Sequence, residues 1–379
     1  MTLAGFVDYG VRLLDLSAYI ATAMRSYVLV IDSFKGCLTS LEAEAVVSET
    51  ICRADPLAEV VSVPVSDGGE GMLDAFLAVM GGERVSLRVR DPLGCPITAS
   101  YGVTRERVAL IESAQAVGLH LVPPHRRNPL VASSYGVGQL VADAYRRGYR
   151  QFIVGLGGTA TCDGGVGMLQ ALVDALGVER EALCEALCDC HFILASDVTN
   201  PLCGPRGAAC VFAPQKGATP AMVSEIEDRV RELAYRAADH LGYDRSGEPG
   251  AGAAGGLGYA FMQFLGAECR SGIDLLLEYL HFDDLIRGAD CVITGEGSAD
   301  EQTLMGKLPY GIMRRARSAG VPTWLVAGRV GARDKLLTAG FERIACINPP
   351  GTPPDVAMRS EVARANLSAT IRTLLEAIP

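Results

Sequence analysis

The chain has 379 residues, of which 49% are hydrophobic, 21% are charged and 6% are aromatic. That length and composition predict a globular protein of two or three domains built from α/β layers. The formal net charge of -10 argues against general nucleic-acid binding, which requires a positively charged surface. No apolar run reaches the roughly 18 residues of a membrane-spanning helix, so we expect no membrane span.

Residues 1–23 differ from the rest of the chain. They lack the basic start of a secretory signal peptide and carry Asp8 and Asp15. Met24 follows directly, and a strand-like pattern begins there. Residues 1–23 are therefore either an added amphipathic helix or a segment before a true start at Met24, and the second interpretation is favoured.

The twelve cysteines are irregularly spaced. Without a secretory signal, they indicate reduced thiols and a cytoplasmic protein. The tightest group is Cys184, Cys188, Cys190 and His191. Zinc sites usually combine two short-spaced pairs of ligands, and no second pair lies nearby, so we interpret this group as mostly buried thiols.

Short apolar runs that end in Gly, Asp or Ser predict buried parallel strands. They are YVLVIDSFKG (27–36), QFIVGLGGTA (151–160), FILASDVTN (192–200), CVITGEGSAD (291–300) and TWLVAGRVG (323–331). Helical stretches separate them, and Thr39 and Glu42 match a capping box at the start of the first. The pattern predicts an α/β fold with a parallel sheet.

Residues 84–113 alternate apolar and polar side chains, with turn residues at 91–94 and 104–107. This alternation predicts a meander of antiparallel strands, and the change in pattern marks a second, mixed α/β domain inserted into the first. The predicted domains are 24–84 plus 285–379, and 85–284, with 1–23 as an extension. We expect the active site in the cleft between the two domains.

Several common catalytic motifs do not occur in the sequence. The chain has no G-x-x-x-x-G-K-[ST] phosphate loop and no G-x-G-x-x-G dinucleotide fingerprint. It also has no H-E-x-x-H or G-x-S-x-G motif, and its five histidines do not cluster. A Rossmann-type oxidoreductase and a histidine-based triad are therefore not expected.

Polar residues gather instead where the predicted strands end, and ligands of parallel sheets bind at that edge. Turn chemistry explains one such cluster, but several clusters with acids, hydroxyls and lysines favour a ligand site. GLGGTATCDGG (155–165) supplies glycines and hydroxyls that suit an anion. Lysines are few, and three of them stand beside glycine: Lys35, Lys216 and Lys307. Together with the nearby carboxylates, they predict phosphoryl transfer assisted by Mg²⁺.

Seven blocks, in a fixed order, closely resemble the glycerate kinase family of the bacterial type (class I). They are IDSFKGCLTSLEA, PVSDGGEGMLDAF, GLGGTATCDGGVGM, SDVTNPLCGPRGA, VFAPQKGA, GAAGGLG and TGEGSADEQTLMGKLPYG. The resemblance implies ATP- and Mg²⁺-dependent phosphorylation of D-glycerate, with 2-phosphoglycerate favoured over 3-phosphoglycerate, in glyoxylate or glucarate metabolism. It also implies a flavodoxin-like domain that is discontinuous in sequence. Val30-Ile31 departs from the family's Ala-Pro before Asp32.

Roles follow for individual residues as a hypothesis. Catalytic residues are predicted to be Asp197, Lys35 and Asp67, with Asp197 as general base or Mg²⁺ ligand. Substrate or phosphate contacts are predicted for Ser33, Gly68, Gly69, Glu70, Gly157, Gly158, Thr159, Thr161, Asp163, Asn200, Gln215, Lys216, Gln302 and Lys307. Predicted metal ligands are Asp197, Glu296 and Asp300. The partner of the glycerate carboxylate is open between Arg329 and Lys307.

Two alternative functions stay open at this point. The chain could phosphorylate another small hydroxy acid or a polyol, because pocket specificity depends on contacts that a sequence does not show. It could also be a catalytically silent sensor of glycerate or nucleotide. The expected partners are ATP and D-glycerate, and a homodimer is left open.

Overall fold

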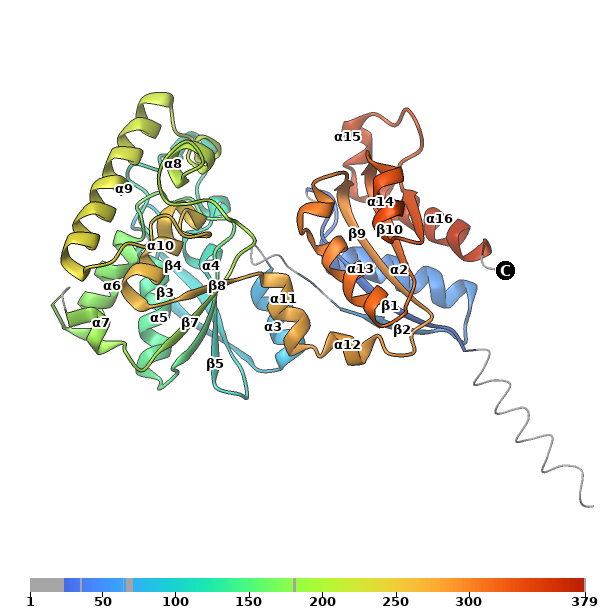
Figure 1. Cartoon of the computed structure of the whole chain (residues 1–379), viewed down its shortest axis with the longest axis horizontal. Coiled ribbons are helices and arrows are strands. Elements are labelled where there is room, and N and C mark those ends of the chain that lie inside the picture. Colours follow the sequence, from blue (N-terminus) through green and yellow to red (C-terminus); the bar gives the residue numbers. More distant parts are fainter. Residues whose placement is uncertain (1–23, 35, 64, 66–70, 180–181, 378–379) are drawn as a thin grey trace, which may run out of the picture. The chain divides into compact units, whose positions relative to one another are not determined.

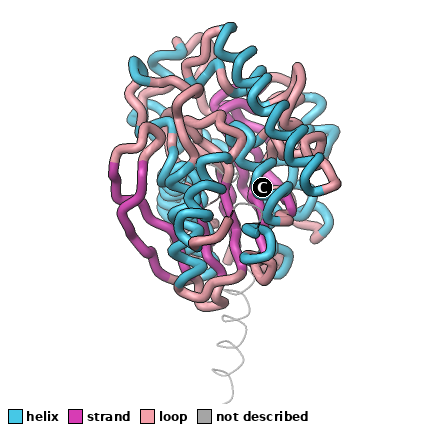
Figure 2. Tube along the Cα trace, turned by 90° about the vertical axis from the view of Figure 1, so that its left-hand side faces the viewer, coloured by secondary structure: helices cyan, strands magenta, loops and turns pink. Residues whose placement is uncertain are grey.

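The computed structural model describes residues 24–34, 36–63, 65, 71–179 and 182–377 (Figure 1). The chain divides into two compact units. Unit 1 comprises Met1–Val65 and His281–Pro379, and unit 2 comprises Ser66–Leu280. Figure 2 shows the helices, strands and loops along the Cα trace. The predicted boundary after residue 84 falls inside a strand of unit 2, whereas the division by contacts lies between Val65 and Ser66.

The described part of unit 1 contains a five-stranded parallel sheet with the order β11-β10-β9-β1-β2. Its strands are β1 (Ser26–Ile31), β2 (Glu59–Ser62), β9 (Cys291–Ala299), β10 (Thr323–Val330) and β11 (Arg343–Cys346). Numbered within the unit, their order is 2-1-3-4-5, which is the flavodoxin-like order. The predicted flavodoxin-like domain, discontinuous in sequence, is therefore confirmed. The order of strands reverses between β1 and β9, and ligands of such sheets bind at this switch point.

Helices cover both faces of the sheet in unit 1. α2 (Ser40–Ala54) and α16 (Ser360–Glu376) pack on one face, and α13 (Leu308–Ser318) and α14 (Arg333–Ala339) pack on the other. Alternate residues of β10 point to opposite faces, so Trp324 joins the first core and Leu325 joins the second. α12 (Phe282–Leu285) and α15 (Pro354–Ala357) complete the described α-helices of this unit.

The predicted capping box at the start of α2 is confirmed. The Thr39 hydroxyl accepts the Glu42 N–H (3.2 Å), and the Thr39 N–H donates to Glu42 Oε2 (2.9 Å). These two bonds satisfy N–H groups that have no partner inside the helix. The capping box fixes where α2 begins, nine positions after the last residue of β1.

The described part of unit 2 contains a six-stranded mixed sheet with the order β3-β4-β5-β6-β7-β8. Its strands are β3 (Glu83–Arg90), β4 (Pro96–Val103), β5 (Val108–Glu112), β6 (Gln151–Gly155), β7 (His191–Ala195) and β8 (Glu268–Arg270). β3, β4 and β5 form the predicted antiparallel meander, and β5 to β8 run parallel. The Gly94 N–H donates to the Asp91 carbonyl (3.0 Å), which places the first turn of the meander where it was expected.

Unit 2 has a larger core than unit 1, and helices supply much of it. The described α-helices are α3 (Met72–Met80), α4 (Ser113–Val117), α5 (Tyr135–Arg146), α6 (Val166–Leu176), α7 (Leu183–Ala186), α8 (Ala208–Phe212), α9 (Pro220–Leu241), α10 (Ala253–Leu265) and α11 (Gly272–Tyr279). In the described part of the chain, no helix combines the length and apolar character needed to cross a membrane. Both units are thus α/β structures, as predicted.

Candidate active site

The carboxyl ends of β6 and β7 carry one group of the predicted site residues, in unit 2. These strands are neighbours, and the Leu156 N–H donates to the Ala195 carbonyl (3.4 Å) just beyond their paired ends. The loop after β6 holds Gly157 to Asp163, and the loop after β7 holds Asp197 and Asn200. The fold therefore brings two of the predicted loops to one edge of a sheet.

Lys216 is buried beneath the loop after β6. The residue is 4% exposed, and its Nζ donates to Thr159 Oγ1 (3.2 Å) and to the Thr161 carbonyl (2.7 Å). Burial lowers the pKa of Lys216, and the nearby Cys162 and Asp163 oppose that shift. Because its donors point into the protein, Lys216 fixes the shape of the loop from inside. Its predicted contact with phosphate stays a prediction.

The exposed part of this loop lies at its glycines. Gly157 is half-buried and Gly158 is exposed with a φ of +71°, whereas Thr159 and Thr161 are buried. The Thr161 hydroxyl oxygen is buried and has no hydrogen-bond partner among the residues that the structure describes. An anion at this edge would therefore meet the backbone of Gly157 and Gly158 before it met either threonine side chain.

Asp163 organises the start of two helices. Its Oδ2 accepts the N–H (2.8 Å) and the hydroxyl (2.9 Å) of Ser134, before α5, and the N–H of Gly167 (3.1 Å), in α6. Its Oδ1 accepts the N–H of Gly165 (3.0 Å). A carboxylate at a helix amino terminus is stabilised there, so a side chain of the protein already fills the anion position of α6. The predicted contact of Asp163 with substrate is not tested by these bonds.

The first residues of α10, three of which have non-helical backbone angles, pack tightly against the loop after β6. Ala254, Gly255 and Gly256 have positive φ angles, and the Gly164 N–H donates to the Gly255 carbonyl (3.0 Å). A Cβ atom on Gly255 would lie 2.0 Å from the Thr161 carbonyl oxygen. Close backbone packing therefore accounts for these glycines.

We expect Gly255→Ala to lower the thermal unfolding midpoint and the activity together, because the new methyl group displaces the Thr161 carbonyl. The loss of stability should exceed about 2 kcal/mol. Gly177→Ala is the matched control, since Gly177 has a similar φ (+66°) and no described atom lies within 4 Å of the place that its methyl group would take. It should cost about 1 kcal/mol and leave activity unchanged. Equal effects of the two substitutions would contradict the packing role.

The loop after β7 is fixed by its neighbours. The Asn200 Nδ2 donates to the Arg206 carbonyl (2.7 Å), and the Asn200 carbonyl accepts the Gly252 N–H (2.9 Å). Asp197 is exposed at the start of this loop. The pKa of the Cys269 thiol is raised mainly by burial, and the negative charge of Asp197 raises it further. An exposed carboxylate on a fixed loop can accept a proton or bind a cation.

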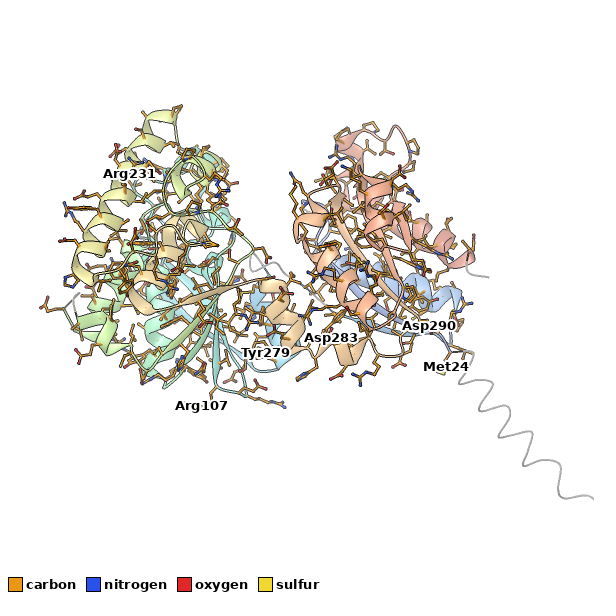
Figure 3. The ribbon with its side chains drawn as sticks, viewed as in Figure 1. Met24, Arg107, Arg231, Tyr279, Asp283 and Asp290 are labelled. Carbon is orange, nitrogen blue, oxygen red and sulfur yellow. The ribbon has the colours of Figure 1, made fainter. Side chains whose placement is uncertain are left out.

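A buried acid supports the next part of this loop from α9. Glu227 Oε1 accepts the Gly204 N–H (2.7 Å) and pairs with Arg231 (2.7 Å), which is labelled in Figure 3. The predicted contact residue Gln215 is exposed near the end of this region, directly before the buried Lys216. These hydrogen bonds hold the backbone of residues 200–207 against neighbouring segments of unit 2.

The carboxyl ends of β1 and β9 carry the second group of predicted residues, in unit 1. The Asp32 N–H donates to the Gly295 carbonyl of β9 (3.0 Å), and the Ser33 N–H donates to Asp32 Oδ1 (2.7 Å). Glu296 follows Gly295 directly. Ser33 therefore lies just after the end of β1, and Glu296 lies in β9 directly after the last residue that pairs with β1, at the topological switch point.

Glu296 is a buried carboxylate with two partners. It is 5% exposed, its Oε1 accepts the Thr303 hydroxyl (2.6 Å) and its Oε2 lies 3.3 Å from Lys307 Nζ. Burial raises the pKa of Glu296, and Thr303 and Lys307 oppose this. Thr303 was not predicted as a site residue, because a threonine seven positions after the acid belongs to no recognised spacing.

Asp300 lies beside this pair and is more accessible. Its Oδ1 accepts the Gln302 N–H (2.9 Å), and its Oδ2 lies 3.9 Å from Arg329 Nη2. The Asp300 N–H donates to the Thr303 hydroxyl (3.0 Å). The predicted residues Glu296, Asp300, Gln302 and Lys307 thus lie in one hydrogen-bonded segment that begins inside β9 and continues after it.

The carboxylates can be compared with what Mg²⁺ requires. Mg²⁺ is usually held by one or two carboxylates, with phosphate oxygens and waters completing its shell. The described residues contain no group of three or more His, Cys, Asp or Glu side chains arranged to hold a metal. Asp197 and Asp300 fit the smaller requirement, since both acids are accessible, whereas Glu296 is only 5% exposed.

Another acid that the sequence analysis missed stabilises α3. Glu112, at the carboxyl end of β5, is 1% exposed and accepts the N–H groups of Gly71 (3.3 Å) and Leu73 (3.0 Å). Burial raises the pKa of Glu112. Glu112 therefore caps the helix that follows SDGGEG.

Five of the predicted site residues lie outside the described residues, namely Lys35, Asp67, Gly68, Gly69 and Glu70.

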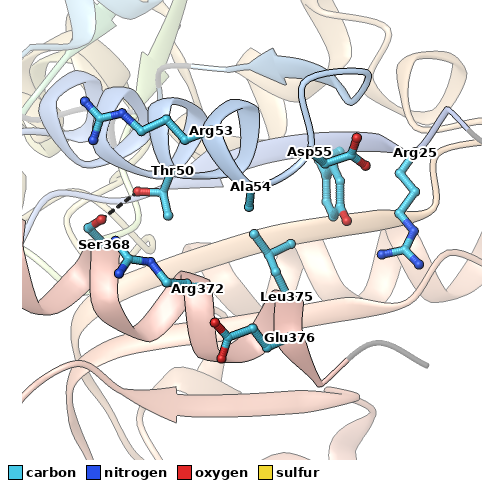
Figure 4. A pocket seen from close by; sticks show the side chains of 10 residues that line it. Arg25, Thr50, Arg53, Ala54, Asp55, Ser368, Arg372, Leu375 and Glu376 are labelled. Atoms are coloured by element: carbon cyan, nitrogen blue, oxygen red, sulfur yellow. Dashed lines mark hydrogen bonds between the residues drawn. The ribbon is translucent and has the colours of Figure 1, made fainter.

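A cavity of about 550 Å³ lies at the opposite end of the sheet in unit 1 (Figure 4). It is lined by Arg25 and Tyr27 at the start of β1, and by residues of α2 and α16 such as Arg53 and Arg372. None of its lining residues was predicted to bind substrate. The candidate site is defined by strand ends and not by this cavity.

Comparisons with known proteins agree with one another. Residues 27–378 match the model of a family described as the glycerate kinase family. A glycerate kinase of Halalkalibacterium halodurans is 40% identical over 328 residues, which cover 81% of this chain and 86% of that protein. A glycerate kinase of Bacillus subtilis is 37% identical over 373 residues, which cover 93% and 97%.

Two further similarities extend this result. A glycerate 2-kinase of Escherichia coli is 40% identical over 321 residues, which cover 79% of this chain and 84% of that protein. The crystal structure of a protein assigned as glycerate kinase 2 from Salmonella typhimurium LT2 superposes with a TM-score of 0.77 at 33% identity. It covers 94% of this chain, and this chain covers 98% of it.

Proposed function

The chain belongs to the glycerate kinase family, and we propose that it transfers the γ-phosphoryl group of ATP to the 2-hydroxyl group of D-glycerate. Relatives at about 40% identity over most of the chain support the kinase activity. The observation that carries the proposal is the gathering of exposed backbone, acids and hydroxyls at strand ends in both units. The name of the Escherichia coli relative, a glycerate 2-kinase, supports 2-phosphoglycerate as the product.

In unit 2, Asp197 acts as the general base. Its carboxylate is exposed at the end of β7, where it accepts the proton of the attacking hydroxyl group. The backbone of Gly157 and Gly158 binds phosphate oxygens, and Asn200 lines the same edge of the sheet. Lys216, Thr159 and Thr161 keep the loop in the shape that exposes its glycines.

In unit 1, the proposed site is the switch point between β1 and β9. Ser33 and Lys307 donate hydrogen bonds to the substrate or phosphate, and Gln302 adds an amide donor. Mg²⁺, when bound, would neutralise charge on the phosphates, and Asp300 is the accessible acid of this unit that would hold it. Glu296 keeps Lys307 in place through their ion pair.

The remaining roles follow the sequence prediction. Lys35 neutralises phosphate charge, and Asp67, Gly68, Gly69 and Glu70 shape the glycerate pocket. Gln215 and Asp163 are secondary to these, because Asp163 already accepts four bonds within the protein. A cytoplasmic location and a homodimer stay predictions.

We expect the purified protein to consume ATP with D-glycerate and only weakly with glycerol or tartronate. A site that hydrogen-bonds a substrate group rejects analogues that lack it, by factors up to about 10⁴. A coupled assay of ADP release measures the rates, and NMR of the product distinguishes 2- from 3-phosphoglycerate. Higher kcat/KM with glycerol or tartronate would favour a kinase of another hydroxy acid or polyol. Binding without turnover would indicate a sensor.

A further inference from the structure

Glu44 places a carboxyl group in the core of unit 1, and the mechanism above does not use it. The residue is 1% exposed and lies on α2, on the buried face that also carries Ala43 and Val47. Burying a carboxyl group costs free energy that an apolar side chain of similar size would not cost. Packing alone therefore does not account for a glutamate at this position.

The hydrogen bonds of Glu44 lie at the end of β1. Successive N–H groups of a strand point to opposite sides, and on the β2 side the Val63 N–H donates to the Leu29 carbonyl (2.9 Å). The next N–H of β1 on that side belongs to Ile31, and it donates to Glu44 Oε1 (3.2 Å) instead of a strand. A side chain thus replaces the partner strand at the last residue of β1.

The other side of the same strand end is fixed by β9. The Asp32 N–H donates to the Gly295 carbonyl (3.0 Å). The Ile31 and Asp32 N–H groups are therefore held from opposite sides, one by Glu44 and one by β9. Ser33 follows directly, so this pair of bonds determines where the turn with Ser33 leaves the sheet.

Ser40 joins Glu44 to a second segment. Its hydroxyl group accepts the Val65 N–H (3.2 Å), and on the same helix, four residues before Glu44, it partly opposes the raised pKa of that carboxyl group. Glu44 Oε2 is buried and has no hydrogen-bond partner among the described residues. Burial raises the pKa of Glu44 to about 8, so the neutral carboxyl group predominates at pH 7. The neutral form can accept the Ile31 N–H without leaving a buried charge.

The bond from the Ile31 N–H to Glu44 is possible only because position 31 is not a proline. Val30-Ile31 stands where the resemblance to the family has Ala-Pro, and proline has no N–H group. Ile31 therefore brings a backbone donor into the core. A buried donor without an acceptor costs stability and leaves the backbone free to shift, and Glu44 supplies the acceptor.

We propose that Glu44 is a positioning residue for phosphorylation, because its carboxyl oxygen fixes the end of β1 and with it the turn that carries Asp32 and Ser33. Glu44 acts through the backbone and does not touch the substrate. The proposal rests on the proposed role of Ser33, and goes beyond it by naming what holds that residue in place.

The test compares Glu44→Met, which keeps the size of the side chain, with Glu44→Gln, which keeps the acceptor. We expect Glu44→Met to remain folded, because removal of the buried carboxyl group offsets the loss of the acceptor for the Ile31 N–H. Its kcat should nevertheless fall by about tenfold or more, because a small displacement of a contact residue is costly. Glu44→Gln should keep kcat within about threefold of the wild type, since its carbonyl oxygen accepts the same N–H.

Hydrogen exchange gives a second measurement that does not depend on turnover. Exchange of the peptide spanning residues 27–34 should be faster in Glu44→Met, and also in Glu44→Ala, than in the wild type. Thr50→Val is the matched control, because Thr50 is a buried polar residue further along α2 whose hydroxyl bonds Val46 and Ser368. It should leave both kcat and this peptide unchanged.

Two results would overturn the proposal. One is a Glu44→Met enzyme with the kcat of the wild type, and the other is exchange of residues 27–34 no faster than in Thr50→Val. If the wild type fails to phosphorylate glycerate, the proposed function is wrong. The exchange measurement would still decide whether Glu44 fixes the strand end.

Discussion

Asp197→Asn is expected to lower kcat by roughly a thousandfold, within the range of 10²–10⁴ typical for removal of a general base. Asparagine has the same size but cannot accept a proton. Because Asp197 is exposed, the unfolding midpoint should hardly change. Steady-state kinetics with D-glycerate and ATP, together with thermal unfolding, measure both quantities on the same preparation.

The control for this substitution is Asp239→Asn, an exposed acid on α9. It makes the same chemical change away from the strand ends and should leave kcat unaltered. Near-normal kcat in Asp197→Asn would show that another group accepts the proton. A loss of activity that recovers when the Mg²⁺ concentration is raised would instead assign Asp197 as a metal ligand.

The short apolar runs in the sequence predicted interior strands of the two sheets. β1, β6, β7, β9 and β10 each lie between two other strands, and each reads as a short apolar run. β2, β8 and β11 were not predicted, and each lies at the edge of its sheet. β2, β8 and β11 have only three or four residues each, so hydrophobic periodicity gives little signal for them.

The sequence also predicted that the site lies at the carboxyl ends of the strands. In a parallel sheet every strand ends at the same edge, so residues after β6 and β7 must come together. What the sequence could not show is whether a charged side chain faces a ligand or the protein. Lys216 and Asp163 stand among glycines, as phosphate-binding residues do, yet both bond backbone and hydroxyl groups of the chain itself.

The supporting residues were harder to predict, because their roles depend on contacts between distant segments. Glu112 caps a helix about forty positions earlier in the chain, and Thr303 bonds an acid on the preceding strand. Glu44 occupies an ordinary position in an amphipathic helix, and its burial arises only when α2 packs on the sheet and on α16. The sequence pattern within one segment does not show such contacts between distant segments.

Stability should depend on pH through Glu44, and the sign follows from its raised pKa. The carboxyl group has a pKa of about 8 when folded, against 4.5 for an ordinary glutamate. Below pH 4.5 Glu44 is protonated in both the folded and the unfolded state, and its contribution to the free energy of unfolding is fully present. As the pH rises towards 8 the unfolded state ionises while the folded state does not, so the free energy of unfolding decreases.

Glu44→Gln removes this titration and isolates its effect, because glutamine stays neutral in both states. The wild type should therefore lose stability relative to Glu44→Gln as the pH rises from about 5 to about 8, by on the order of 4 kcal/mol. Thermal unfolding midpoints of the two proteins, measured across this range, give the difference. The buried acids Glu112 and Glu296, whose pKa values are also raised, are present in both proteins and cancel. A difference that stays constant with pH would mean that Glu44 is ionised in the folded protein, and its bond to Ile31 would then be that of a buried carboxylate.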